Sequence, residues 1–183
     1  MTEQPSKQSL FQAYCELTKI KLSLLVVMST GVAFLMASEL GIDWVAFLWT
    51  LIGTTLSATA AATWNQLFER KRDAKMSRTK DRPIPSGRIS MLHAFIVGVL
   101  LTYSGLSILA FGANPAAAGI SLLTILTYVF IYTPLKPRTT FNTFIGAIVG
   151  ALPPLIGWVA AVGTLSSGAW IMGGILFLWQ IPH

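Results

Sequence analysis

Charge is scarce in this sequence, and so is cysteine. Only 11% of the residues are charged, whereas 54% are hydrophobic, and the mean hydropathy is +0.65. An ordinary soluble domain is considerably more polar than this. The single cysteine, Cys15, excludes an internal disulfide and a cysteine-based metal cluster. The high apolar content favours a protein embedded in a lipid bilayer. No repeat or low-complexity tract is evident, which is consistent with one domain.

Long apolar runs occupy most of the chain. A helix needs about 20 mostly apolar residues to cross a bilayer. Six stretches reach or approach that length: residues 22–40, 43–65, 90–111, 115–133, 141–163 and 169–183. The turns between them are too short to hold a separate soluble domain. We therefore predict a single all-α domain over residues 1–183, a polytopic transmembrane helical bundle with a polar site loop at residues 66–89.

Basic residues are missing from one side of this predicted bundle. If the N-terminus is cytoplasmic, all 13 Lys and Arg residues fall on the cytoplasmic side, and the opposite side carries only Glu39 and Asp43. The positive-inside rule then predicts a cytoplasmic N-terminus and a cytoplasmic loop 66–89. This asymmetry accounts for the net charge of +6 without a nucleic-acid partner.

The composition of the first 18 residues argues against an organelle transit peptide. They contain Glu3 and Glu16 but no Arg, whereas transit peptides are rich in Arg and poor in acids. We expect a multi-pass protein of a bacterial cytoplasmic (inner) membrane, surrounded by membrane lipid.

Three oxygen-bearing side chains follow the second apolar run at helical spacing. Asn65, Glu69 and Asp73 stand at i, i+4 and i+8, so they form one stripe if the helix continues beyond the membrane. Two such carboxylates repel each other unless a cation lies between them. Amide and carboxylate oxygens suit Mg²⁺, which also binds substrate phosphates. The alternative is a solvated helix end in which Glu69 pairs with Arg72, and Asp73 with Arg70.

The segment after the stripe is cationic and broken by Pro and Gly, which end the helix. Its basic residues are Arg78, Lys80, Arg82 and Arg88. Arginine side chains match phosphate oxygens in a bidentate geometry, so the loop favours contact with a diphosphate leaving group.

These residues resemble a known family, the UbiA-type intramembrane prenyltransferases, and within it the heme O synthase branch. The superfamily motif Asn-Asp-x-x-Asp-x-x-x-Asp aligns with Asn65, Gln66, Glu69 and Asp73, of which Gln66 and Glu69 depart from the general pattern. The resemblance covers residues 17–183 and is carried by LTKIKLSLLVV, DAKMSRTKDRPIPSGRIS, YTPLKPRTTFNTFIGAIVGALPPLIGW and LWQIPH.

The resemblance implies transfer of the farnesyl group of farnesyl diphosphate to a vinyl group of heme B, giving heme O for heme-copper terminal oxidases. It implies Mg²⁺ on Asn65, Glu69 and Asp73, and oxidase assembly proteins that hand on the heme. The implied diphosphate contacts are Arg78, Lys80, Arg82, Tyr132 and Lys136. For Tyr132 and Lys136 the alternative is an interfacial tyrosine and a lysine that extends to the membrane surface. His183 is a candidate heme ligand, with an interfacial or hydrogen-bonded residue as the alternative.

Two other functions stay open. One is a related prenyltransferase acting on a quinone or chlorophyll precursor, and the other is a non-catalytic transporter or assembly factor. Family members have about nine spans and a second acid-rich loop facing the first. The apolar run 169–183 has no polar flank after it, so we expect a truncated chain that is inactive or severely impaired alone.

Overall fold

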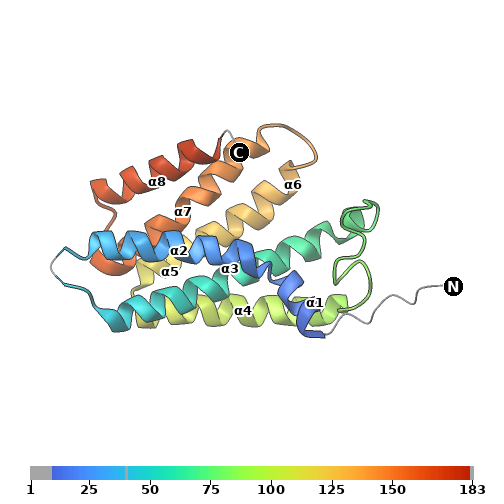
Figure 1. Ribbon diagram of the computed structural model, residues 1–183, viewed down its shortest axis with the longest axis horizontal. Helices are drawn as coiled ribbons and strands as arrows, with labels where there is room; N and C mark the ends of the chain where they lie inside the picture. Colours follow the sequence, from blue (N-terminus) through green and yellow to red (C-terminus); the bar gives the residue numbers. More distant parts are fainter. Residues whose placement is uncertain (1–9, 40, 182–183) are drawn as a thin grey trace.

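The computed structural model describes residues 10–39 and 41–181, and these form helices and connecting segments with no strand among them. The helices are α1 (Leu10–Leu17), α2 (Ile20–Ala37), α3 (Trp44–Asp73), α4 (Met91–Gly112), α5 (Pro115–Leu126), η1 (Thr127–Tyr132), α6 (Thr133–Leu135), α7 (Asn142–Val162) and α8 (Ser167–Gln180). They pack as one elongated bundle (Figure 1).

Five helical segments in the described part of the chain are long and apolar enough to cross a membrane. They are α2, α3, α4, the run Pro115–Leu135 that joins α5 to η1 and α6, and α7. The predicted all-α membrane bundle is therefore confirmed. Helix α8 has 14 residues, shorter than the other five. The sixth span, the total of nine and the side of the N-terminus stay predictions.

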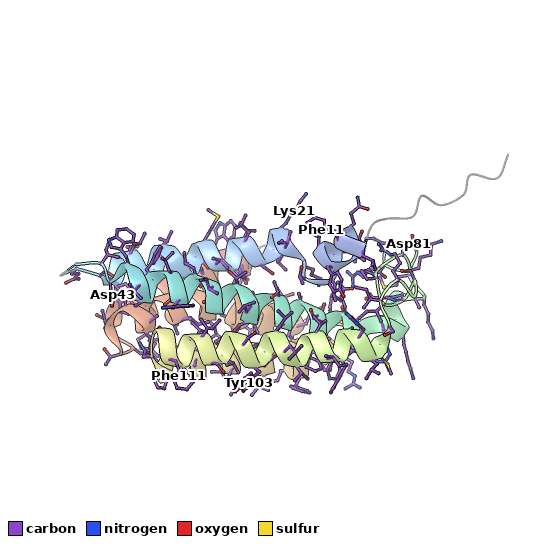
Figure 2. The ribbon with its side chains drawn as sticks, turned by 90° about the horizontal axis from the view of Figure 1, so that it is seen from below. Phe11, Lys21, Asp43, Asp81, Tyr103 and Phe111 are labelled. Carbon is purple, nitrogen blue, oxygen red and sulfur yellow. The ribbon has the colours of Figure 1, made fainter. Side chains whose placement is uncertain are left out.

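Side chains on the outside of the bundle are those expected in contact with lipid. Tyr103 and Phe111 of α4 are 73% and 92% exposed and point outward along the side of the bundle (Figure 2). Asp43 lies at one end and Asp81 at the other (Figure 2). The apolar flank and the polar ends match a protein whose long axis crosses the bilayer.

Helix α7 packs mainly against α2, α5 and α8. Its Gly157 lies directly against the backbone of α2, where a Cβ atom would overlap the Thr30 carbonyl oxygen. Thr30 Oγ1 also donates a hydrogen bond to the Pro153 carbonyl oxygen, at 3.1 Å. Small residues allow this close approach between membrane helices.

The segment between α3 and α4 is fixed to the end of the bundle. Residues 74–90 consist of turns that connect α3 to α4. A small apolar cluster packs these turns against α1 and the ends of α3 and α4. The cluster consists of Ala13, Leu17, Leu67, Ile84, Ile89 and Ala94. Helix α1 is tied to α4 by the Tyr14 hydroxyl, 2.5 Å from His93 Nε2. The site loop is therefore held by side chains from three helices.

Candidate functional site: a buried acidic stripe with four cations

Helix α3 continues without a break to Asp73, as the acidic spacing requires. Asn65, Glu69 and Asp73 are 1%, 6% and 3% exposed. Three polar side chains at this spacing, all buried, lie on the face of α3 that turns toward the rest of the protein. The alternative interpretation predicted that this helix end is exposed to solvent, and that part of it is wrong.

Cations from distant segments meet the two carboxylates. Arg82 Nη1 lies 2.7 Å from Asp73 Oδ2 and 3.9 Å from Glu69 Oε2. Lys136 Nζ lies 3.4 Å from Glu69 Oε1. The structure thus brings Arg82 and Lys136, two of the predicted diphosphate contacts, onto the stripe.

The two ion pairs of the alternative interpretation differ in outcome. Arg72 Nη1 does approach Glu69 Oε1, at 3.6 Å. Arg70 Nη1 instead donates to the Leu67 carbonyl oxygen at 2.8 Å, and Asp73 is paired with Arg82. Local pairing along the helix therefore explains one contact of Glu69, while the chain's return after α3 supplies the partner of Asp73.

The other predicted contacts that the structure describes, Arg78, Lys80 and Tyr132, form no ion pair or hydrogen bond with the carboxylates. Arg78 and Lys80 are exposed, and among the described residues neither forms an ion pair with the stripe. Tyr132 stacks on Tyr128, with ring centroids 5.4 Å apart and planes 14° apart, and lines a cavity. His183 lies outside the described residues.

Lys19 belongs to the site, although sequence reasoning assigned it only to membrane topology. Its Nζ donates to Asn65 Oδ1 at 2.9 Å, from a corner between α1 and α2. Burial, and then the positive charges of Arg82 and Lys136, lower the pKa of Lys19 from 10.5 to about 8. Lys19 lies in the stretch LTKIKLSLLVV, which carries part of the family resemblance. That position was the sign in the sequence that Lys19 could belong to the site.

The amide of Asn65 is held on both sides. Its Nδ2 donates to Thr133 Oγ1 at 3.1 Å, and the Thr133 hydroxyl donates to the Tyr128 carbonyl oxygen at 2.8 Å. Tyr128 lies in the π-helical turn η1, and Thr133 directly follows that turn, just before Pro134, which has no N–H to continue an α-helix. The wider π turn, a feature common at functional sites, places the Thr133 hydroxyl against α3.

A cavity of about 800 Å³ lies next to the stripe, between α2, α3, α5, η1, α7 and α8. Ala61 and Ala62 line it one turn before Asn65 on α3, and Tyr128 and Tyr132 line it from η1. Most of the lining is apolar, with scattered hydroxyl groups. The stripe therefore stands beside a space suited to an apolar chain.

The donor atoms of the stripe fit a hard divalent cation. Within the described residues, no group of three or more His, Cys, Asp or Glu could hold a metal alone. The stripe offers two carboxylates and one amide oxygen instead. Mg²⁺ commonly binds through one or two carboxylates and takes its other ligands from water and substrate phosphates. The residues present therefore fit a metal that is completed by a diphosphate.

Comparison with known proteins gives a consistent result. The profile of the UbiA prenyltransferase family matches residues 26–183. A "Protoheme IX farnesyltransferase" of Solibacter usitatus is 44% identical over 93% of this chain and 61% of its own length. A mitochondrial protein of the same name from Homo sapiens is 46% identical over 91% of this chain and 38% of its own length. The chain thus spans less than two thirds of these relatives.

Two solved structures share the fold. One, from a study of digeranylgeranylglyceryl phosphate synthase, has a TM-score of 0.78 at 21% identity and covers 95% of this chain and 59% of its own. The other, a UbiA homolog from Archaeoglobus fulgidus bound to DMAPP and Mg²⁺, has a TM-score of 0.72 at 17% identity and covers 92% and 60%. The likeness to these structures shows the fold, and the match of the family profile over most of the sequence shows that the chain belongs to the UbiA prenyltransferase family.

Proposed function

We propose that this protein transfers the farnesyl group of farnesyl diphosphate to a vinyl group of heme B, giving heme O. The observation that carries the proposal is the buried stripe Asn65–Glu69–Asp73, set among cations beside an apolar cavity. The acceptor is proposed from relatives at 40–46% identity that bear the name protoheme IX farnesyltransferase. The donor class agrees with a fold neighbour described as binding DMAPP.

The cations have two partners in this mechanism. In the structure Arg82 and Lys136 neutralise Glu69 and Asp73. Mg²⁺ bound to Asn65, Glu69 and Asp73 would supply positive charge against the departing diphosphate. Arg82 and Lys136 then donate to the phosphate oxygens, where Arg can form two parallel hydrogen bonds.

The bond changes balance with one water. The C1–O bond of farnesyl diphosphate breaks, and its electron pair leaves with diphosphate. The π electrons of the heme vinyl form a carbon–carbon bond to C1, and water captures the new cation beside the porphyrin and loses a proton. Groups such as Arg82 act where charge develops, so they lower the barrier to C–O cleavage.

The cavity protects the reaction from early water. An allylic cation exposed to bulk water would be hydrolysed before the vinyl group reached it. The volume of about 800 Å³ is within the range of small-molecule pockets, roughly 300–1,000 Å³. Tyr128 and Tyr132 line the cavity near the stripe, and we propose that they border the reacting end of the farnesyl chain.

We also propose a bacterial cytoplasmic membrane, with the stripe on the cytoplasmic side and heme supplied or removed by oxidase assembly proteins. All 13 basic residues fall on that side under this orientation. This distribution of charge supports the cytoplasmic side for the stripe.

The acceptor is tested by offering two alternatives. The natural full-length protein in lipid nanodiscs receives farnesyl diphosphate, Mg²⁺ and an equimolar mixture of heme B and 4-hydroxybenzoate, and mass spectrometry identifies the products. We expect heme O, and none after Asp73→Asn. Farnesylated 4-hydroxybenzoate as the only product would overturn the heme assignment, and unchanged activity of Asp73→Asn would overturn the role of the stripe.

A further inference from the structure

The corner between α1 and α2 has an unusual backbone. Lys19 adopts φ 47° and ψ 51°, and it is the one non-glycine residue with positive φ in the described part of the chain. This left-handed conformation is unfavourable for a residue with a Cβ atom and persists only where surrounding contacts hold it. The corner therefore needs a restraint from elsewhere in the fold.

Gln66 supplies that restraint. Its Nε2 donates to the Glu16 carbonyl oxygen at 2.7 Å and to the Leu17 carbonyl oxygen at 3.1 Å. These carbonyls belong to the last turn of α1, where helical partners run out. Gln66 is 1% exposed and Leu17 is fully buried, so both ends of the contact are fixed by packing. Two hydrogen bonds thus attach the α1–α2 corner to α3, next to Asn65.

The chemistry of Gln66 explains the departure from the superfamily motif. An aspartate, which the general motif carries here, is one methylene shorter and has no N–H to donate to a carbonyl oxygen. The amide side chain can cap α1, and its neighbours in the motif, Asn65, Glu69 and Asp73, remain as metal ligands. The amide at this position therefore supports the backbone of the corner, with its Nε2 on the Glu16 and Leu17 carbonyl oxygens.

The α1–α2 corner places the Lys19 ammonium group next to Asn65 of the stripe. Besides its contact with Asn65 Oδ1, it joins Arg72, Arg82 and Lys136 around the carboxylates of Glu69 and Asp73. Three cations then lie within 3.9 Å of two buried carboxylates, and the Lys19 ammonium is a fourth, on the neighbouring Asn65 amide. Such an excess of positive charge favours a polyanion, and a bound divalent metal would add to it.

We propose that Gln66 is a positioning residue that holds the left-handed corner so that the Lys19 ammonium binds an oxygen of the substrate diphosphate. The inference deepens the proposed function and rests on it. Lys19, at the α1–α2 corner, is then a contact of the diphosphate. Gln66 acts by positioning Lys19 and is not a ligand of the metal.

The test is a double-mutant cycle on diphosphate binding. Wild-type protein, Lys19→Met, Gln66→Met and the double variant are placed in nanodiscs, and titration calorimetry measures the affinity for inorganic diphosphate in the presence of Mg²⁺. Lys19→Met should weaken binding by about 10- to 100-fold, as expected for a lost hydrogen bond to a charged group. Gln66→Met should weaken it in the same direction, and the double variant should be no weaker than Lys19→Met alone.

Two further variants separate position from general damage. Lys19→Arg keeps the charge and should recover most of the affinity. Lys21→Met is the matched control, because Lys21 is exposed and projects from the outer side of α2 (Figure 2). It should change the affinity by no more than about twofold, as surface substitutions do. If Gln66→Met fails to fold, the comparison of Lys19→Met, Lys19→Arg and Lys21→Met still decides the role of Lys19.

The outcomes distinguish this inference from the proposed function. If wild-type protein binds diphosphate and Asp73→Asn does not, but Lys19→Met binds normally, the inference is wrong and the proposed function stands. Additive losses in the double variant would show that Gln66 acts independently of Lys19, which also contradicts the inference. A wild-type protein that binds no diphosphate with Mg²⁺ would overturn the proposed function itself.

Discussion

Arg82 and a bound metal compete for the same two carboxylates, so we expect Arg82→Met to become dependent on Mg²⁺ for stability. Arg82 Nη1 contacts Asp73 directly and reaches Glu69, and the two carboxylate side chains are 4% and 5% exposed. Breaking a buried ion pair costs about 3–5 kcal/mol when one charge is left without a partner. Arg82 is 22% exposed, and Glu69 keeps Lys136 and Arg72, so we expect about 2–3 kcal/mol.

Mg²⁺ should recover much of that loss. A ligand at 100 times its dissociation constant stabilises the folded state by about 2.7 kcal/mol, and here it also replaces the missing cation. The measurement is thermal unfolding in detergent, with EDTA and with Mg²⁺, for wild-type protein, Arg82→Met and Arg78→Met. Arg78 is the control because it is exposed and in the same loop.

We expect Arg82→Met to unfold at a lower temperature than the wild type in EDTA and to approach it in Mg²⁺, while Arg78→Met follows the wild type in both. An equal loss of stability in EDTA and in Mg²⁺ would refute the reasoning, since the carboxylates would then bind no metal in place of the guanidinium.

Three further predictions concern packing, the π turn and the loop. Gly157→Ala should lower the free energy of unfolding by about 1–3 kcal/mol, because its Cβ would overlap the α2 backbone, whereas Gly119→Ala, which meets no atom within 4 Å, should not; denaturant titration compares the two. Thr133→Val should weaken Mg²⁺-dependent diphosphate binding by about 3- to 10-fold, because the amide of Asn65 loses its acceptor; a wild-type affinity would contradict this. Lys80→Gln should change the KM for farnesyl diphosphate by less than about threefold, because Lys80 is exposed and away from the carboxylates; a tenfold rise would place it in the binding site.

The sequence was sufficient for the features that depend on local periodicity. Apolar runs of membrane length predicted the spanning helices, and the i, i+4, i+8 spacing predicted a stripe on α3. Burial of Asn65, Glu69 and Asp73 could not be predicted in this way, because it depends on loop 74–90 and α1 folding back over the end of the bundle.

The choice among the cations also needed the structure. Arg78, Lys80 and Arg82 have similar charge and lie in one loop, yet only Arg82 is turned onto the carboxylates. Lys19 reaches Asn65 from 46 positions earlier in the chain, through a left-handed corner that no local sequence pattern indicates. Long-range contacts and an unfavourable backbone conformation leave little trace in periodicity or composition.

Electron paramagnetic resonance of bound Mn²⁺ tests the metal–diphosphate site most directly. Carboxylate, amide and water ligands suit Mn²⁺ as well as Mg²⁺, so Mn²⁺ can report on the same site. In the natural full-length protein we predict that farnesyl diphosphate adds a ³¹P hyperfine coupling to protein-bound Mn²⁺, and that Asp73→Asn removes it. A ³¹P coupling of the same size in Asp73→Asn and Glu69→Gln would contradict the assignment of the stripe as the metal site.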